Sequence, residues 1–186
     1  MVKLAICLVH FPIYDRKGNK TCTNITTFDI HDIARLARTY NLCRYYIAHP
    51  FRSQREIAFR IIQYWTAGKG GELNHDRSEA LRLVRVVPSL EDAQEDLKER
   101  FGAPPYSVYT DARPLRVSIS YSQFKRKIRR SKRPGILIFG TGWGIVRDEI
   151  ERGDFFLEPV GHTSDYNHLS VRSAASIILD RIFRLR

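Results

Sequence analysis

The chain alternates short apolar runs with longer stretches in which apolar residues recur at helical spacing. The strand-like runs cover residues 3–11, 43–48, 81–87, 106–110, 135–139 and 155–158. The helical stretches cover residues 27–41, 51–65, 89–100, 122–131, 145–152 and 165–185. Strands that alternate with helices pair in parallel, so this order predicts an α/β fold: a mostly parallel sheet with helices on both faces. Because no repeat, low-complexity tract or linker interrupts the pattern, we expect one domain over residues 1–186.

The charge of the chain is strongly one-sided. It has 31 Lys and Arg residues against 20 Asp and Glu, a formal net charge of +11 and a pI of about 9.9. The densest run, residues 124–133, holds seven cations in ten positions. Such a run also suits a solvated helix face, but acidic charge serves solubility equally well. The basic excess therefore favours a polyanionic partner, RNA or DNA.

Several classes of protein are disfavoured by what the sequence lacks. The cysteines, Cys7, Cys22 and Cys43, form neither a disulfide framework nor a CxxC pair, and we expect them to act as small hydrophobes. The six histidines form no HExxH motif, so we expect no metal site. No run of eighteen apolar residues predicts a membrane span, and the start is too polar after Phe11 for a signal peptide. We therefore expect a cytoplasmic protein without a membrane partner.

A glycine-rich turn follows the strand-like run at 135–139, where the sequence reads ILIFGTGWGI over residues 136–145. The turn does not match the GxGxxG dinucleotide fingerprint, and no GK[ST] follows it as in a P-loop. It is either a tight structural turn with positive φ or a place where a ligand approaches the backbone closely. Two other loops, residues 110–112 and 158–161, also follow strand-like runs. Because ligands of parallel sheets bind at the carboxyl ends of strands, we expect these three loops to form one pocket.

A polar cluster lies at the start of the last helical stretch. An amphipathic helix is expected from about Leu169, and polar side chains crowd its first turns. These are Asn167, His168, Ser170, Arg172 and Ser173. The free N–H groups at a helix N-terminus make a binding site when polar side chains surround them. Ordinary capping by Asp165 or Asn167 is the alternative interpretation.

Two blocks of the sequence resemble a known family. The glycine turn followed by the block at 157–175 resembles the SPOUT class of RNA methyltransferases, above all its small stand-alone bacterial branch of SAM-dependent enzymes. Residues 8–50 are similar to the start of that branch, where His-Tyr/Phe-Pro precedes a polar loop and Asp-x-His-Asp-Ile-Ala-Arg opens the first helix. The resemblance spans nearly the whole chain, although residues 51–105 carry no specific motif.

The resemblance implies an α/β fold whose C-terminal part forms a deep trefoil knot, with S-adenosylmethionine bound between three loops of the knot. In this chain the first loop would contribute Thr110 and Asp111, and the second Phe139, Gly140, Thr141, Gly142, Trp143 and Gly144. The third would contribute Leu157, Glu158, Pro159, Val160, Asn167, His168, Leu169, Ser170 and Ser173. Glycines allow the close backbone approach that a flat adenine ring requires.

The resemblance also implies a catalytic group. In ribose-methylating relatives an arginine of the first helix assists catalysis, and Arg35 stands at that place. An ion pair with Asp32 or Asp29 is the structural alternative for Arg35. Asp32 and His31 are further candidates for handling the proton that the acceptor releases. Because Asp29 and His31 replace the Asn and Gly of those relatives, and His168-Leu169-Ser170 replaces their Ser-Leu-Asn, the acceptor is open between a base nitrogen and a ribose 2′-oxygen.

The family implies RNA, tRNA or rRNA, as substrate and a homodimer as the working unit. We expect charge to hold the RNA, through Arg52, Arg55, Lys69, Lys125, Lys127, Arg129, Arg130, Lys132 and Arg133. One alternative is a basic RNA-binding protein of the same fold that has no catalytic activity. A flavodoxin-like or nicotinamide-binding protein is a further alternative, disfavoured because the glycine fingerprint is missing from the first strand-helix unit.

Overall fold

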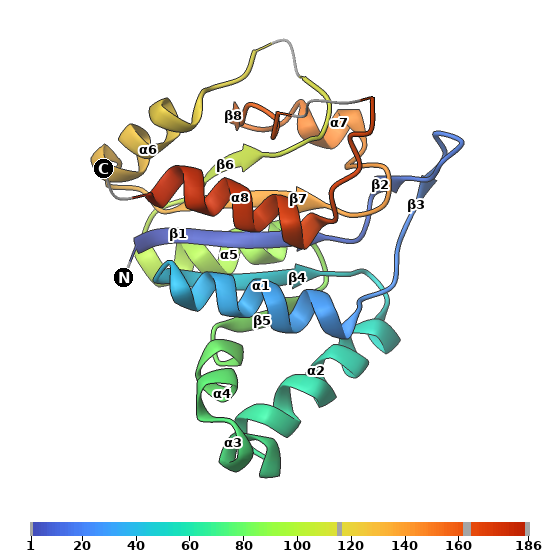
Figure 1. Ribbon diagram of the computed structural model, residues 1–186, viewed down its shortest axis with the longest axis vertical. Helices are drawn as coiled ribbons and strands as arrows, with labels where there is room; N and C mark the ends of the chain where they lie inside the picture. The colour runs from blue at the N-terminus through green and yellow to red at the C-terminus, as the bar shows by residue number, and fades with distance from the viewer. Residues whose placement is uncertain (1, 115–116, 162–164, 185–186) are drawn as a thin grey trace.

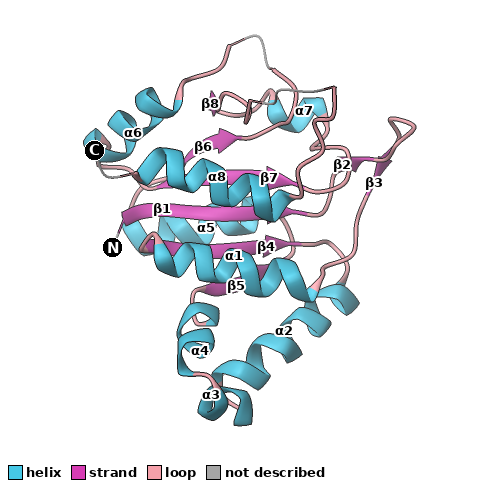
Figure 2. Ribbon diagram, viewed as in Figure 1, coloured by secondary structure: helices cyan, strands magenta, loops and turns pink. Residues whose placement is uncertain are grey.

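The computed structural model describes residues 2–114, 117–161 and 165–184, and its core is one six-stranded sheet. The strand order is β5-β4-β1-β7-β6-β8, and every neighbouring pair is parallel. The strands are β1 (Val2–Val9), β4 (Leu42–Ala48), β5 (Val84–Val87), β6 (Tyr106–Tyr109), β7 (Gly135–Gly140) and β8 (Phe155–Phe156). A short antiparallel ribbon of two strands, β2 (Ile13–Tyr14) and β3 (Lys20–Thr21), extends beyond the sheet (Figure 2). The predicted parallel α/β sheet is confirmed.

Helices cover both faces of the sheet, as predicted. They are α1 (Thr27–Thr39), α2 (Arg52–Thr66), α3 (Lys69–Leu73), α4 (His75–Leu81), α5 (Leu90–Phe101), α6 (Tyr121–Arg130), α7 (Arg147–Ile150) and α8 (Val171–Phe183). Figure 1 shows α1 and α8 side by side on one face of the sheet and α5 on the other. None of the helices in the described part of the chain is both long and apolar enough to cross a membrane.

The alternation of side chains along β1 creates two separate cores. Leu4, Ile6 and Leu8 point to the face covered by α1 and α8, which we call the α1 face. Ala5, Cys7 and Val9 point to the face covered by α5, which we call the α5 face. Successive side chains of a strand point to opposite sides, and a parallel sheet is buried on both. Cys7 and Cys43 are buried free thiols on the α5 face, in keeping with the expected role as small hydrophobes.

Several elements differ from the sequence prediction. The last helix begins at Val171, two residues after the expected start at about Leu169, because Ser170 caps it by accepting a hydrogen bond from the Ser173 N–H, 3.2 Å away. The strand expected over residues 81–87 begins only at Val84, because Leu81 ends helix α4. Helices α3 and α4 were not predicted; the side chain of Asn74 caps α4.

Candidate cofactor site

The largest described cavity, about 610 Å³, lies at the carboxyl ends of β6 and β7, beside the N-termini of α1 and α8. Its lining comprises Thr23, Asn24, Thr26, Asp29, Thr110, Asp111, Ala112, Arg113, Phe139, Gly140, Thr141, Gly142, Trp143, Gly144, Glu158, Pro159, Val160, Asn167, His168, Leu169, Ser170, Val171, Ala174 and Ile178. All residues predicted to hold the cofactor belong to this wall except Leu157 and Ser173. Leu157 is buried beneath it, and Ser173 lines a neighbouring hollow.

The glycine turn, residues 140–144, has the backbone of a true turn and lies against an acidic side chain. Gly142 has φ +57° and Gly144 has φ +92°, conformations that disfavour any residue with a Cβ. A Cβ at Gly144 would also lie 3.1 Å from Oδ2 of Asp111. Trp143 at the tip is 52% exposed. The turn therefore brings bare backbone to the cavity wall while its large side chain stays accessible.

The N-terminal loop, residues 10–26, holds the glycine turn in place. The N–H of Tyr14 donates to the carbonyl of Gly144 at 2.8 Å, and the N–H of Trp143 donates to the carbonyl of Tyr14 at 3.1 Å. The hydroxyl oxygens of Thr23 and Thr141 lie 2.5 Å apart. Thr23 itself lines the cavity. The first block of the family resemblance thus reaches the cofactor wall, which the sequence alone did not indicate.

Two buried histidines support Thr23 from below. Nδ1 of His10 is hydrogen-bonded to the Thr23 hydroxyl at 3.0 Å, and Nε2 of His49 to the Thr23 carbonyl at 3.0 Å. Burial, with help from neighbouring His49, lowers the pKa of His10 to about 4. Burial also lowers the pKa of His49, and the charge of Arg55 acts in the same direction. Both rings are therefore neutral at pH 7 and act as fixed hydrogen-bonding groups.

Two carboxylates stand in the cavity wall. The side chain of Asp111 is 3% exposed and is bound by Arg113, whose Nη2 lies 2.8 Å from Oδ2. Asp29 is 7% exposed and accepts a 2.5 Å hydrogen bond from the hydroxyl of Thr26. Asn167 closes another side by donating its amide to the carbonyl of Ala112 at 2.9 Å. The wall is thus partly anionic in a strongly cationic chain.

A second hollow of about 380 Å³ adjoins the cavity, and Ser170 lines both. Its other lining residues are Asp32, Arg35, Leu36, Arg172, Ser173 and Ser176. Arg172 pairs with Asp32 at 3.2 Å and with Asp29 at 3.6 Å. Arg35 has no ion pair or hydrogen bond within the described residues, so the ion pair considered for it with Asp32 or Asp29 is made by Arg172 instead.

The three catalytic candidates are not brought together. Asp32 and Arg35 line the second hollow, but His31 lines neither space. Its ring packs edge-on against Trp65, with centroids 5.8 Å apart, and its Nδ1 is buried without a partner in the described structure. Burial lowers the pKa of His31, as do the charges of Arg77 and Arg35. The geometry therefore favours Arg35 and Asp32 over His31.

The basic residues fall into two groups. Helices α6 and α2 lie at opposite ends of the long axis (Figure 1). Within α6, Lys127 is held over the rings of Tyr106 and Phe155, at 4.9 and 4.2 Å, whereas Arg129 and Arg130 are exposed. The expected cations therefore do not form one continuous patch.

One cluster of metal-ligand type occurs in the described parts of the chain, at His75, Asp76 and Glu79. All three ligand atoms lie within 4.8 Å of one another. Glu79 is already bound to Arg38 by a 2.5 Å ion pair, and the other two side chains are exposed. The cluster is therefore explained as solvent-exposed side chains at the start of α4.

Comparisons with known proteins agree with this geometry. The model of a family described as SAM-dependent RNA methyltransferase matches residues 3–184. An Aquifex aeolicus protein is 42% identical over 178 residues, which cover 96% of this chain and 87% of that protein. A tRNA (guanine-N(1)-)-methyltransferase of Oleidesulfovibrio alaskensis is 39% identical over 179 residues, or 96% of this chain. The chain spans only 41% of that longer relative.

A solved structure shares the fold at low sequence identity. The SpoU methyltransferase AviRb from Streptomyces viridochromogenes, in complex with the cofactor AdoMet, aligns with a TM-score of 0.62 and 15% identity. The alignment covers 99% of this chain and 61% of that one. The fold is therefore that of SPOUT methyltransferases, and the knot that the class implies stays a prediction for this chain. With the family model matched over nearly its whole length, the chain belongs to the S-adenosylmethionine-dependent RNA methyltransferase family.

Proposed function

We propose that this enzyme methylates tRNA and that the 610 Å³ cavity against the glycine turn is its cofactor site. The observation that carries the proposal is the meeting of distant loop segments, at 110–113, 140–144, 158–160 and 167–170, around one space. Its volume lies within the range of about 300–1,000 Å³ typical of small-molecule sites. The relative from Oleidesulfovibrio alaskensis, a tRNA methyltransferase by name, supports tRNA over other RNA.

The residues of the cavity fit the proposed cofactor. The backbone of the glycine turn is open to a flat ring. The Asp111 and Asp29 carboxylates are each paired with an arginine, and their oxygens offer hydrogen-bond acceptors in the wall. S-adenosylmethionine supplies a methyl group activated by a sulfonium charge. The protein itself must orient the RNA and help the acceptor lose its proton.

Arg35 is the group we assign to the acceptor. Its guanidinium is exposed beside the cavity and is bound by no described acid, so it is available to a phosphate or an acceptor oxygen. Asp32 is bound to Arg172 at 3.2 Å, beside Arg35 in the lining of the second hollow. We assign Asp32 a positioning role and His31 none in the reaction.

We further propose that the enzyme is a homodimer that works in the cytoplasm. Phe28 is 63% exposed and lies under the guanidinium of Arg172, 5.1 Å from its ring centre. Leu169, which lines the cavity, is 49% exposed. Exposed apolar side chains beside a site are typical of interaction surfaces, and a second copy here would cover both the cavity and the second hollow.

The test combines cofactor binding with transfer. Calorimetric titration with S-adenosylmethionine is compared for the native chain, Gly142→Ala and Gly102→Ala. Both glycines have positive φ, but a Cβ at Gly142 lies 2.8 Å from Cδ1 of Ile13, whereas at Gly102 it meets nothing. We expect binding to be lost only in Gly142→Ala. We also expect the native chain to transfer the methyl group from labelled cofactor to bulk tRNA. Nucleoside mass spectrometry of that tRNA identifies the acceptor. Binding without transfer to any RNA would favour a non-catalytic protein.

A further inference from the structure

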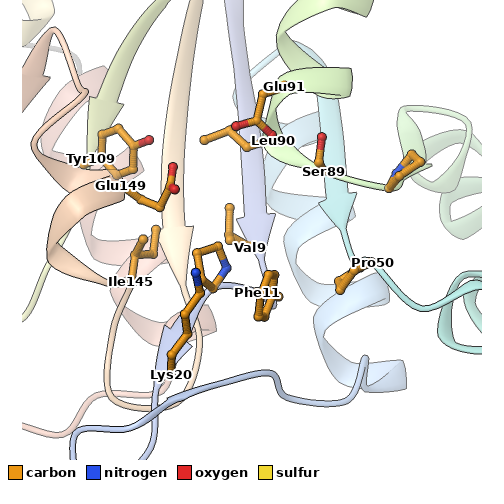
Figure 3. A pocket seen from close by; sticks show the side chains of 12 residues that line it. Val9, Phe11, Lys20, Pro50, Ser89, Leu90, Glu91, Tyr109, Ile145 and Glu149 are labelled. Carbon is orange, nitrogen blue, oxygen red and sulfur yellow. The ribbon is translucent and has the colours of Figure 1, made fainter.

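A smaller cavity of about 290 Å³ opens on the α5 face (Figure 3). Val9, Tyr109 and Ile145 of its lining belong to the α5-face core, whereas Phe139 and Ile178 of the cofactor cavity belong to the α1-face core. The sheet and the glycine turn therefore separate the two spaces. At this volume the cavity suits one planar group more than an entire cofactor.

The hydroxyl of Tyr109 points into this cavity. Tyr109 is 3% exposed, and its hydroxyl has no hydrogen-bond partner in the described residues. Its ring is seated against Gly153, where a Cβ would lie 2.5 Å from Cδ2. Figure 3 shows the hydroxyl directed toward the cavity. Because the hydroxyl faces the cavity and makes no hydrogen bond to the described residues, it is free to donate to an acceptor atom of a ligand.

Two carboxylates stand near that hydroxyl. Glu149 is held by Arg152 at 3.2 Å, and Glu91 lies in the first turn of α5, where the helix dipole favours a negative charge. Burial and these two charges raise the pKa of Tyr109, so it stays protonated and donates. The inner wall thus offers one donor beside strong acceptors.

The mouth of the cavity suits a nucleotide. Phe11 is 40% exposed, and the ammonium of Lys20 lies 5.2 Å from its ring centre. Pro12, Pro50 and Pro88 add flat apolar surface. An aromatic face with an adjacent cation is typical of sites that stack a base and contact its phosphate.

We propose that this cavity binds an unstacked guanine of the substrate RNA, with Tyr109 donating to O6 and a glutamate accepting from N1–H and N2–H. Guanine alone among the four bases places one acceptor beside two donors on its Watson–Crick edge, whereas adenine and cytosine cannot match the same wall. The proposal rests on the proposed function for its ligand being RNA. Because the glycine turn lies between the cavities, this guanine is not the methyl acceptor but a base that positions the RNA.

The experiment is a titration of the protein with guanosine 5′-monophosphate, in which ¹H–¹⁵N NMR and calorimetry measure the binding. Saturating S-adenosylhomocysteine keeps the nucleotide out of the cofactor cavity. Adenosine and inosine 5′-monophosphates, Tyr109→Phe and Glu149→Gln serve as comparisons. Tyr106→Phe is the matched control, because Tyr106 is equally buried in β6 but faces the other core.

We expect guanosine monophosphate to shift the amides of Leu90 and Ile145, and Tyr109→Phe to weaken binding about tenfold while Tyr106→Phe does not. Inosine monophosphate, which lacks N2–H, should bind more weakly, and adenosine monophosphate weakest. Equal binding of all three nucleotides would overturn the guanine assignment. Binding of free arginine without binding of any nucleotide would also overturn the guanine assignment, because the cavity would then accept an arginine side chain of a protein partner. Intact S-adenosylmethionine binding and tRNA methylation in the same protein preparation, measured without S-adenosylhomocysteine, would show that the proposed function stands even where the guanine site fails.

Discussion

The hydroxyls of Thr23 and Thr141 lie 2.5 Å apart although 118 positions separate them in the sequence. Thr23 also binds Nδ1 of His10, and the Thr141 hydroxyl donates to the carbonyl of Val9 at 3.3 Å. The loops that follow β1 and β7, two neighbouring central strands, are therefore joined directly under the cofactor cavity. The shape of the glycine turn depends on this link.

Replacing Thr23 with valine should loosen the turn and leave Nδ1 of His10 without its partner. The loss of one hydrogen bond corresponds to about 1 kcal/mol, so we expect S-adenosylmethionine to bind about fivefold more weakly. Calorimetric titration measures the change. Thr39→Val, at the exposed end of α1, is the control. Unchanged affinity in Thr23→Val would mean that the turn holds its shape without this link.

His10 should make folding stability depend on pH. Its pKa is about 4 in the folded protein and about 6.5 when unfolded, so only the unfolded chain takes up the proton between these values. Stability is therefore full above pH 6.5 and falls toward pH 4, by about 3 kcal/mol from this residue. His49, whose pKa is also lowered, acts with the same sign.

Urea unfolding at several pH values measures this dependence. In His10→Asn, which does not titrate, the decline should be shallower. The exposed His75 provides the control variant, His75→Asn, whose pH profile should match that of the native chain. Parallel profiles for the native chain and His10→Asn would contradict the assignment.

Replacing Arg35 with alanine should reduce the rate of methyl transfer at least about a hundredfold, because the acceptor loses its orienting cation. Affinity for S-adenosylmethionine should persist, since Arg35 does not line the cofactor cavity. Single-turnover kinetics with saturating tRNA separates the two effects. Arg38→Ala is the matched control: Arg38 is also exposed on α1 but is paired with Glu79. Normal turnover in Arg35→Ala removes the residue from the mechanism.

If the homodimer shares its sites, two inactive variants should complement each other. Arg35→Ala and Gly142→Ala are mixed after mild unfolding and refolding. Random pairing of equal amounts makes about half of the dimers mixed. If Arg35 serves the cavity of the other copy, each mixed dimer has one intact site of two. About a quarter of native activity should therefore return. Each variant alone is the control. No recovery in a mixture shown by sedimentation to be dimeric would confine Arg35 to its own subunit.

The exposed cations of α6 should act through phosphate charge. The double variant Arg129→Ala/Arg130→Ala should weaken tRNA binding and reduce the slope of log K against log salt by about 1.5. Filter binding between low and moderate salt measures the slope. The control is Arg38→Ala/Lys98→Ala, which removes two cations that are paired with Glu79 and Glu95. Equal losses in both double variants would indicate an effect of net charge alone.

Much of the fold could be predicted because its long elements carry clear periods. The central strands are apolar runs bounded by turns, and α1 shows Ile30, Ile33, Ala34 and Ala37 at helical spacing. The strand order could not be predicted, because β1, β4 and β7 are similar apolar runs whose pairing depends on contacts across the whole chain. Elements of two to seven residues, such as β2 and α4, are too short to show a period.

The candidate site was predictable where it follows strand ends and family motifs. The residues that sequence reasoning missed come mainly from the loop after β1 and the first turn of α1: Thr23, Asn24, Thr26 and Asp29. Thr23 is held there by a hydrogen bond to Thr141, 118 positions away, and no local pattern records such a bond. The cavity on the α5 face was missed because Tyr109 and Glu149 look like ordinary strand and helix residues until Gly153 and Ile145 bring them together.

The pairing of β1 with β7 also has a consequence for how the protein is made. β1 leaves the ribosome well before β7, and one of its two edges stays open until β7 is synthesised, since Leu4 pairs with Gly135 and Val9 with Gly140. An unpaired edge of an apolar central strand is a template for aggregation. Between the synthesis of β1 and that of β7 the nascent chain therefore carries an exposed sheet edge at the future centre of the sheet, and the segment that closes it is the one that delivers the glycine turn.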